Sequence, residues 1–463
     1  MKIPFGERAY ATRSLNANAQ ELINYYVEVN PDSSKASLVT YPTPGTELFV
    51  DLGIFPIRGM HEFLGDLYAV SGTVLYKISK TGIVTNLGII SGSGRVSIAD
   101  SGKEMCIVNG TDGYVYSDSA GLLRILDPAW FPSDTVIYRN RRFIFIRKGT
   151  NQFFISNAYD GLHFDALNFD QITTNPDLLV SSLADHAYIW LFGTKSTNIW
   201  AYSGDEAGFP FSEVTGTALE KGCGAIHTPI QMDNSIYWLG NDGVVYNGVG
   251  FKASRISTHA IETAINSYAT FSDAYSYSYE EEGHSFLVIT FPSGNATWVY
   301  DASIRDVGRA WSQRRTGLTG RHLSADHAFV NEKHYIGDYR TGKIYRSSLD
   351  LYNDNGERIY RVASTPTIHG NRRRLFMDRL EVDIESGVGD GTENPTAILN
   401  YSDDGGKTWS KDKYATLGKI GTYATRLKFH NLGSFYQRVF KLTIADPVQT
   451  VILDAEATGD LEV

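Results

Sequence analysis

The chain is 463 residues long, which exceeds one hydrophobic core of ordinary size and predicts two domains. Hydrophobic residues make up 42% of it and charged residues 20%, which is typical of a folded protein and excludes a disordered one. The net charge of −10, from 42 basic and 52 acidic side chains, argues against a dedicated nucleic-acid binder, because such proteins depend on clustered Lys and Arg.

The cellular setting is indicated by what the sequence lacks. Cys106 and Cys223 are its only cysteines, too few for a disulfide framework or a Cys-rich zinc site, which indicates a reducing compartment. Residues 1–8 show no secretory signal, and no run approaches the roughly 18 apolar residues of a membrane span. We therefore expect a protein that folds in the cytosol and makes no membrane contact.

In chain order we expect an all-β protein: an N-terminal arm (residues 1–50), a β-propeller (51–350) and a β-sandwich (351–463). The arm either closes the last blade or reaches a neighbouring subunit.

A loose repeat predicts the propeller. Each unit has an apolar strand, a turn centred on Gly or Asn, and a second strand that ends in an aromatic residue. Seven such aromatics follow one another at intervals of 40, 38, 46, 46, 54 and 45 residues: Tyr76, Tyr116, Phe154, Trp200, Tyr246, Tyr300 and Tyr345.

This period is typical of four-stranded propeller blades, which must stack radially because one blade cannot bury both of its faces alone. We predict seven blades, with six as the alternative. One helix is expected between blades, with Ser257 and Thr258 as its cap and an apolar face. That face consists of Ile261, Ala264, Ile265 and Tyr268.

Beyond residue 355 the sequence changes to strand-like stretches with alternating apolar residues, which is typical of a sandwich. The clearest are Leu380–Ile384, Ala397–Tyr401, Arg426–Phe429, Val439–Ile444 and Val448–Leu453. The acidic tail Ala455–Val463 is expected to be frayed, or else to dock on a partner.

Residues 402–409 fit the Asp-box pattern S-x-D-x-G-x-T-W at every position, through Ser402, Asp404, Gly406, Thr408 and Trp409. The pattern indicates a structural turn. Its Asp accepts backbone N–H groups, its Gly adopts a strained φ, and its Trp packs beneath. Asp boxes also occur in sialidases, so a propeller glycosidase is an alternative. That enzyme needs several arginines around a carboxylate and a Tyr nucleophile with a Glu partner, and the sequence identifies no such set.

Other motifs favour ordinary surface structure. Gly405–Thr408 lacks the first glycine of a phosphate-binding loop, and Asp354–Gly356 lacks the rest of a calcium loop. Glu280–Glu282 precedes Gly283 and indicates a solvated hairpin turn. None of the 11 histidines has the paired spacing of a zinc site. We predict no catalytic residue, no metal and no cofactor.

Two basic clusters remain. One consists of Arg139, Arg141 and Arg142, and the other of Arg372, Arg373 and Arg374 followed by Arg379. Each is either a solvated surface or a contact with an acidic neighbouring subunit or with DNA phosphate.

Short segments spread in order along the chain resemble the packaged-DNA stabilisation proteins, or tail hubs, of short-tailed phages. The segments are Asn24–Asn30 with Tyr41–Gly45, Ser91–Ser97, Lys221-Gly222 with Thr228-Pro229, the helix Ser257–Tyr268, Val299–Ser303 with Trp311 and Thr316–Leu318, and Lys441–Ile444 with Asp446–Val448.

The resemblance implies a structural virion protein without enzymatic activity, assembled in the host cytoplasm as a homohexameric ring in the phage tail. The ring would lie below the portal and its adaptor protein, retain packaged DNA until genome ejection, and carry a tail needle or plug. A tailspike or fibre is a further expected partner, and DNA would pass through the ring without tight binding. A propeller that binds other proteins in general is the remaining alternative.

Overall fold

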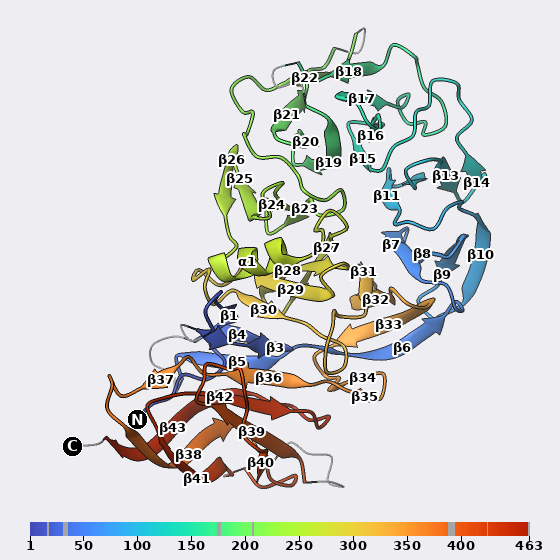
Figure 1. Cartoon of the computed structure of the whole chain (residues 1–463). Helices are drawn as coiled ribbons and strands as arrows, with labels where there is room; N and C mark the ends of the chain where they lie inside the picture. Colours follow the sequence, from blue (N-terminus) through green and yellow to red (C-terminus); the bar gives the residue numbers. More distant parts are fainter. Residues whose placement is uncertain are drawn as a thin grey trace.

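The computed structural model describes residues 1–15, 18–30, 36–173, 177–205, 208–387, 394–423 and 425–461. It consists of a seven-bladed β-propeller and a β-sandwich, which confirms the predicted fold class (Figure 1). Five blades are separate four-stranded antiparallel sheets, and the remaining two are extended by further strands.

The strands of each blade follow one another in sequence from the propeller axis outward. Blades one to three consist of β7 (Ile57–Phe63), β8 (Asp66–Ser71), β9 (Val74–Ile78) and β10 (Val84–Ile89); β11 (Ser97–Asp100), β12 (Met105–Val108), β13 (Gly113–Ser117) and β14 (Gly121–Arg124); and β15 (Val136–Arg139), β16 (Arg142–Ile146), β17 (Gln152–Ile155) and β18 (Phe169–Gln171).

Blades four to six consist of β19 (Leu179–Asp185), β20 (Tyr188–Gly193), β21 (Thr197–Tyr202) and β22 (Phe211–Glu213); β23 (Ile230–Met232), β24 (Ser235–Leu239), β25 (Val245–Val249) and β26 (Lys252–Arg255); and β27 (Tyr275–Glu281), β28 (His284–Phe291), β29 (Ala296–Asp301) and β30 (Trp311–Gln313). The seven aromatics that defined the repeat all lie in the third strand of a blade, so the sequence predicted the register of the repeat correctly.

The seventh blade joins the two ends of the propeller. It contains β31 (Ser324–Val330), β32 (Lys333–Asp338), β33 (Lys343–Ser348) and, from the N-terminal region, β6 (Gly45–Asp51). β33 pairs antiparallel with β6, so residues before the first blade close the last one. The innermost strands contact one another in sequence order, and β31 contacts β7 to complete the ring.

Helix α1 (His259–Ser267) lies between the fifth and sixth blades, as predicted. Thr258 caps it by accepting a hydrogen bond from the Ile261 N–H. Ile261 and Ile265 bury its apolar face.

One sheet of the sandwich is continuous with the sixth blade. β3 (Leu22–Ile23) pairs with β30 on one side and with β36 (Arg361–Ser364) on the other, so one sheet runs from the propeller into the sandwich. It continues through β42 (Gln437–Ile444), β39 (Thr396–Ser402) and β40 (Lys413–Thr416), with β37 (Ile368–His369) beside β42. The facing sheet contains β4 (Tyr25–Val29), β5 (Leu38–Pro42), β43 (Ile452–Leu461), β38 (Leu375–Ile384) and β41 (Leu427–Phe435).

Two small hairpins complete the described chain. β1 (Tyr10–Ala11) pairs with β2 (Ala19–Gln20), and β34 (Asn353–Asp354) pairs with β35 (Glu357–Arg358). β34 also pairs with β6, so this second hairpin covers the outer edge of the seventh blade.

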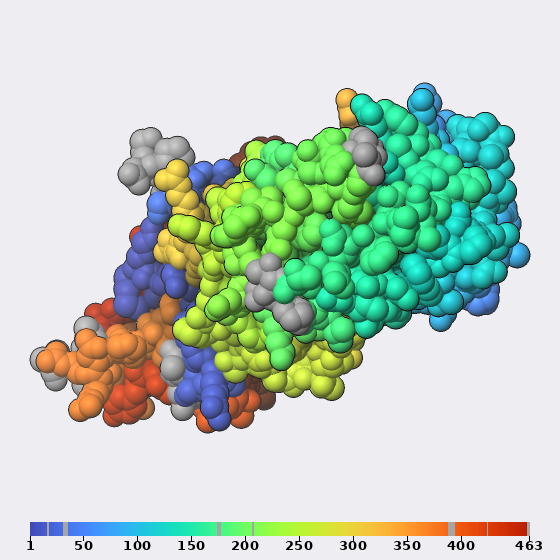
Figure 2. All heavy atoms as spheres, turned by 90° about the horizontal axis from the view of Figure 1, so that it is seen from above, coloured from blue at the N-terminus to red at the C-terminus, as the bar shows by residue number. Residues whose placement is uncertain are grey.

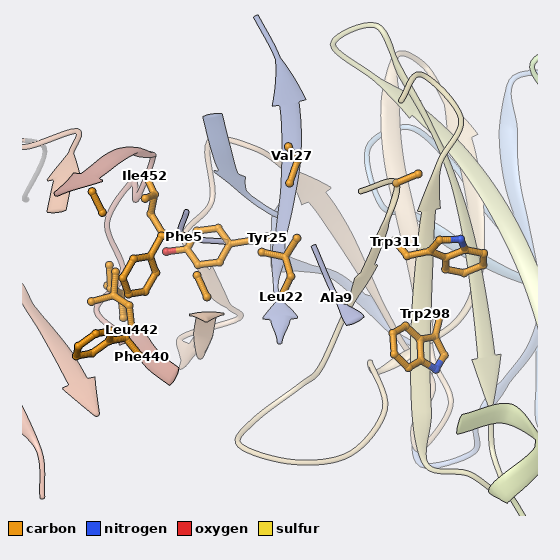
Figure 3. Close-up of a cluster of buried hydrophobic side chains, with 14 of the residues drawn as sticks. Phe5, Ala9, Leu22, Tyr25, Val27, Trp298, Trp311, Phe440, Leu442 and Ile452 are labelled. Carbon is orange, nitrogen blue, oxygen red and sulfur yellow. The ribbon is translucent and has the colours of Figure 1, made fainter. Parts of the chain in front are cut away.

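One hydrophobic core is shared by both domains. Trp298 and Trp311 contribute to it from the sixth blade, and Phe440 and Leu442 from the sandwich. N-terminal side chains lie between these two groups (Figure 3): Phe5, Ala9, Leu22, Tyr25 and Val27. The segment expected to be an arm is therefore part of the core that joins the domains. The boundaries at residues 50 and 350 remain a prediction about folding units.

The end of the chain corrects two expectations. β43 begins at Ile452, so most of the predicted strand Val448–Leu453 precedes the real strand. The tail is not frayed up to Leu461, because β43 pairs with both β38 and β5. Ala455 and Ala457 are buried, so the alternation of apolar with acidic residues there marks a strand with one covered face.

Candidate functional site

The innermost strands of the propeller enclose an axial cavity of about 450 Å³. Its wall is mostly hydroxyl and aliphatic groups, with charged side chains at two places. His61 Nε2 lies 2.7 Å from an Asp100 carboxylate oxygen, and Arg95 lies 3.7 Å from Asp326. His227 also lines the cavity, and burial lowers its pKa to about 3, so it is neutral at physiological pH.

The charged side chains of the cavity connect one blade to another. The Met60 N–H donates to the Asp326 carboxylate, and the Arg95 guanidinium lies 4.2 Å from the centre of the Tyr275 ring. Since each group already has a partner from another blade, the arrangement stabilises the ring.

The cavity wall does not contain the side chains that the glycosidase alternative requires. Of the described residues that line it, one is Arg (Arg95), one is Tyr (Tyr138) and none is Glu. A sialidase-like site needs several arginines and a Tyr with a Glu partner. The axis therefore gives that alternative no support.

The Asp-box residues form the turn between β39 and β40. The Asp404 carboxylate accepts hydrogen bonds from the Thr408 hydroxyl (2.6 Å), the Ser402 hydroxyl (2.7 Å), and the backbone N–H groups of Lys407 and Thr408 (both 2.9 Å). These bonds, led by the one from the Thr408 hydroxyl, hold the pKa of Asp404 far below its usual range. Gly406 has φ +90°, a conformation that favours glycine.

Trp409 lies against the turn, and a Cβ on Gly406 would be 3.6 Å from its Cζ2 atom. It is half-buried at the surface of the sandwich, and Lys441 Nζ lies 3.8 Å from the centre of its ring. The ring therefore faces the Lys441 ammonium group, and burial lowers the pKa of that lysine.

The first basic cluster lies on the hairpin between β15 and β16. Asn140 and Arg141 form its two-residue turn with φ of 48° and 71°. Arg142 donates to the Ser156 carbonyl at 2.9 Å, and the Arg141 guanidinium lies 5.5 Å from the Tyr159 ring centre. Arg139 is partly exposed.

The second basic cluster lies in the sandwich, on the turn between β37 and β38. Arg372, Arg373 and Arg374 are all exposed, and Arg374 lies 5.9 Å from the centre of the exposed Tyr436 ring. Arg379 is separate from them, because it pairs with Glu381 at 3.0 Å. The structure thus places the two basic clusters in different domains and does not bring them together.

The sequence did not reveal a group of buried charges where the two domains meet. Arg314 and Arg361 are 3% and 0% exposed, and they donate to the carbonyls of Pro44 and Tyr352. Asp354 is buried beside them and accepts a hydrogen bond from the Thr46 hydroxyl; burial raises its pKa to about 6. The predicted turn is present at Asn355-Gly356, but Asp354, which precedes it, is buried. No local pattern marks its burial, which results from the pairing of β34 with the distant strand β6.

In the part of the chain that the structure describes, His, Cys, Asp and Glu side chains do not gather in groups of three or more that could hold a metal ion. No described helix is both long and apolar enough to cross a membrane.

Two family models match this chain. Residues 2–351 match the model described as "Bacteriophage P22 Gp10, beta-propeller", and residues 360–460 match "Bacteriophage P22 Gp10, beta-sandwich". The two matches define a structural protein of a phage tail. The chain belongs to the bacteriophage P22 Gp10 family, which confirms the resemblance drawn from its sequence.

Comparison with curated proteins gives no match. Among solved structures, the N-terminal domain of Nup159 aligns with a TM-score of 0.41 at 10% identity, covering 71% of this chain and 99% of that one. PorZ, from the type-IX secretion system of Porphyromonas gingivalis, aligns with a TM-score of 0.38 at 14% identity, covering 78% of this chain and 46% of that one. The extracellular domain of BT4673 from B. thetaiotaomicron aligns with a TM-score of 0.44 at 10% identity, covering 92% and 62%.

Proposed function

We propose that this protein is a non-enzymatic hub of the phage tail. Six copies form a ring below the portal and its adaptor protein, retain packaged DNA, and attach the tail needle or plug. The observation that carries the proposal is the pair of family matches, which together extend over residues 2–351 and 360–460 and so include both domains.

The way the two domains are joined supports a role as a rigid connector in the tail. One sheet continues from the sixth blade through β3 into the sandwich, and one hydrophobic core fills the space between them. An interface of that kind resists relative domain motion, whereas small polar interfaces permit it. A rigid unit is suited to transmit force between the head and the distal tail.

The charge of the chain supports a ring that surrounds DNA without holding it. With a net charge of −10, the subunit repels phosphate on average, so that DNA can slide during ejection. The exposed arginine turns then serve contacts with protein neighbours, among them the adaptor, the needle and a tailspike or fibre.

Disruption of this protein's gene in the parent phage tests the proposal. We expect heads that package DNA and then lose it, and restored DNA retention when the full chain is supplied from a plasmid. Particles that lack the chain yet keep their DNA and infect normally would contradict the proposed function.

A further inference from the structure

Two histidines of the seventh blade lie in direct contact. His327 is on β31 and His334 is on β32, and the Nε2 atom of the first lies 3.0 Å from the Nδ1 atom of the second. The register of the hairpin causes this contact. His334 pairs with Phe329, which lies on the same face of β31 as His327. Because the hairpin brings the two histidines together, no metal-site spacing marks them in the sequence.

Aromatic rings from two blades hold the imidazoles in place. The Tyr277 ring of β27 stacks on the His327 ring with centroids 5.6 Å apart. The Tyr279 and Phe329 rings lie 5.9 Å and 4.7 Å from the ring of His334, again between centroids. Packing therefore sets the positions of both imidazoles before any ligand binds, which is how a binding site is preorganised.

Both imidazoles are neutral at physiological pH. Burial lowers the pKa of His327 to about 3, helped by the neighbouring imidazole and the charge of Arg314, and burial also lowers the pKa of His334. Neutral imidazole is the form that binds metal ions. One ring donates its N–H to the nitrogen of the other. The opposite tautomer of that donor has a lone pair on both facing nitrogens, and no proton is lost in the change.

The distance between the two nitrogens indicates a class of metal ion. Two ligands about 2.1 Å from one ion are about 3.0 Å apart when they meet it at a right angle, and about 3.4 Å apart at a tetrahedral angle. Right angles are typical of Cu²⁺ and Ni²⁺ sites. We propose that His327 and His334 together chelate one divalent transition-metal ion of this class. No third His, Cys, Asp or Glu joins them in a group within the described residues, so water completes the coordination.

The pair is accessible from the tip of its hairpin. Both histidines are half-buried, and Asn331 and Glu332 in the turn are exposed. The orange and red sandwich lies to one side of the propeller (Figure 2). A metal ion at this site ties β31 to β32 within the blade that β6 closes. Since a ligand that binds only the folded chain stabilises it, the ion should raise the melting temperature.

Calorimetric titration of the untagged full-length chain with NiCl₂ tests the site. The parent should bind one Ni²⁺ that His327→Asn and His334→Asn each bind about 10²-fold more weakly, because one of two linked ligands is lost. Asparagine keeps a polar group beside the remaining histidine, and circular dichroism without metal checks the fold of each variant. His259→Asn is the matched control. It removes an exposed imidazole on α1 and should leave the titration unchanged.

Electron paramagnetic resonance of the parent gives a measure that needs no variant. With half an equivalent of Cu²⁺, the spectrum should show coupling to two nitrogen nuclei. In thermal melts, NiCl₂ should raise the melting temperature of the parent and of His259→Asn, and should leave those of His327→Asn and His334→Asn unchanged.

Two results would overturn the proposal. One is equal Ni²⁺ affinity in the parent and both site variants, which would place the ion on other groups. The other is Cu²⁺ coupled to a single nitrogen. Neither result bears on the proposed tail function, because the metal site does not rest on it.

Discussion

The shared core makes a quantitative prediction about Trp311. This side chain is 0% exposed, its ring lies 5.2 Å from that of Tyr300, and its Nε1 donates to the Ile256 carbonyl at 2.8 Å. Trp311→Ala should cost about 3–5 kcal/mol for the cavity. The carbonyl that loses its donor adds about 1 kcal/mol.

Calorimetry measures this cost. An unfolding entropy of about 2.1 cal/mol/K per residue gives roughly 1 kcal/mol/K for a chain of 463 residues that unfolds as one unit. We therefore expect a single transition, displaced downward by about 4–6 °C.

Trp409→Ala is the matched control. Its half-exposed ring contacts Lys441, and an exposed cation–π contact contributes about 0.5–1 kcal/mol. Two transitions in the parent, of which only one moves in Trp311→Ala, would refute the shared core as the link between the domains.

Four further outcomes are expected. The purified chain should not cleave a fluorogenic sialoside; turnover abolished by changing one Tyr or Glu would contradict the structural interpretation. Gel shifts near physiological salt should show negligible duplex DNA binding by the parent and by the variant in which Arg372, Arg373 and Arg374 are all changed to Glu; tight, salt-sensitive binding lost in that variant would make DNA a direct ligand. Asp404→Ala should lower the melting temperature more than Asp404→Asn, which keeps an acceptor oxygen for the Thr408 and Lys407 donors; superimposable melts would remove the turn from the stabilising elements. The hydrogen bond that the His284 Nδ1–H donates to the Asp301 carboxylate (2.7 Å) raises the pKa of His284. Because the folded state thus favours the protonated imidazole, this stabilisation is present below about pH 6.5 and is lost as the pH rises through the higher folded-state pKa. The stability that His284 contributes should therefore fall between pH 6 and pH 8, so the difference in melting temperature between the parent and His284→Asn should be smaller at pH 8 than at pH 6.

The sequence revealed what depends on local pattern. Each blade is a meander of adjacent strands, so its hydrophobic alternation and turns are contiguous, and the recurring aromatics gave the blade register. Helix α1 was identified by its Thr258 cap and the spacing of Ile261 and Ile265. In the same way, the Asp-box pattern located a turn whose hydrogen bonds are local.

Features that depend on distant pairing were predicted less completely, and the sequence left open whether residues 1–50 close the last blade or reach a neighbouring subunit. The structure shows the first alternative: β6 closes the last blade by pairing with β33, and Gly45 pairs with Ser348, 303 positions further along the chain. The continuity of the sheet through β3 and the burial of Asp354 arise from the same kind of long-range contact.

Cryo-electron microscopy of the parent particle tests the central claim most directly. The account predicts density for this propeller and sandwich as a ring around the DNA path, between the portal adaptor and the tail needle or plug. Density for this fold at the tip of a tailspike or elsewhere off the DNA axis, or its absence from the particle, would contradict the account.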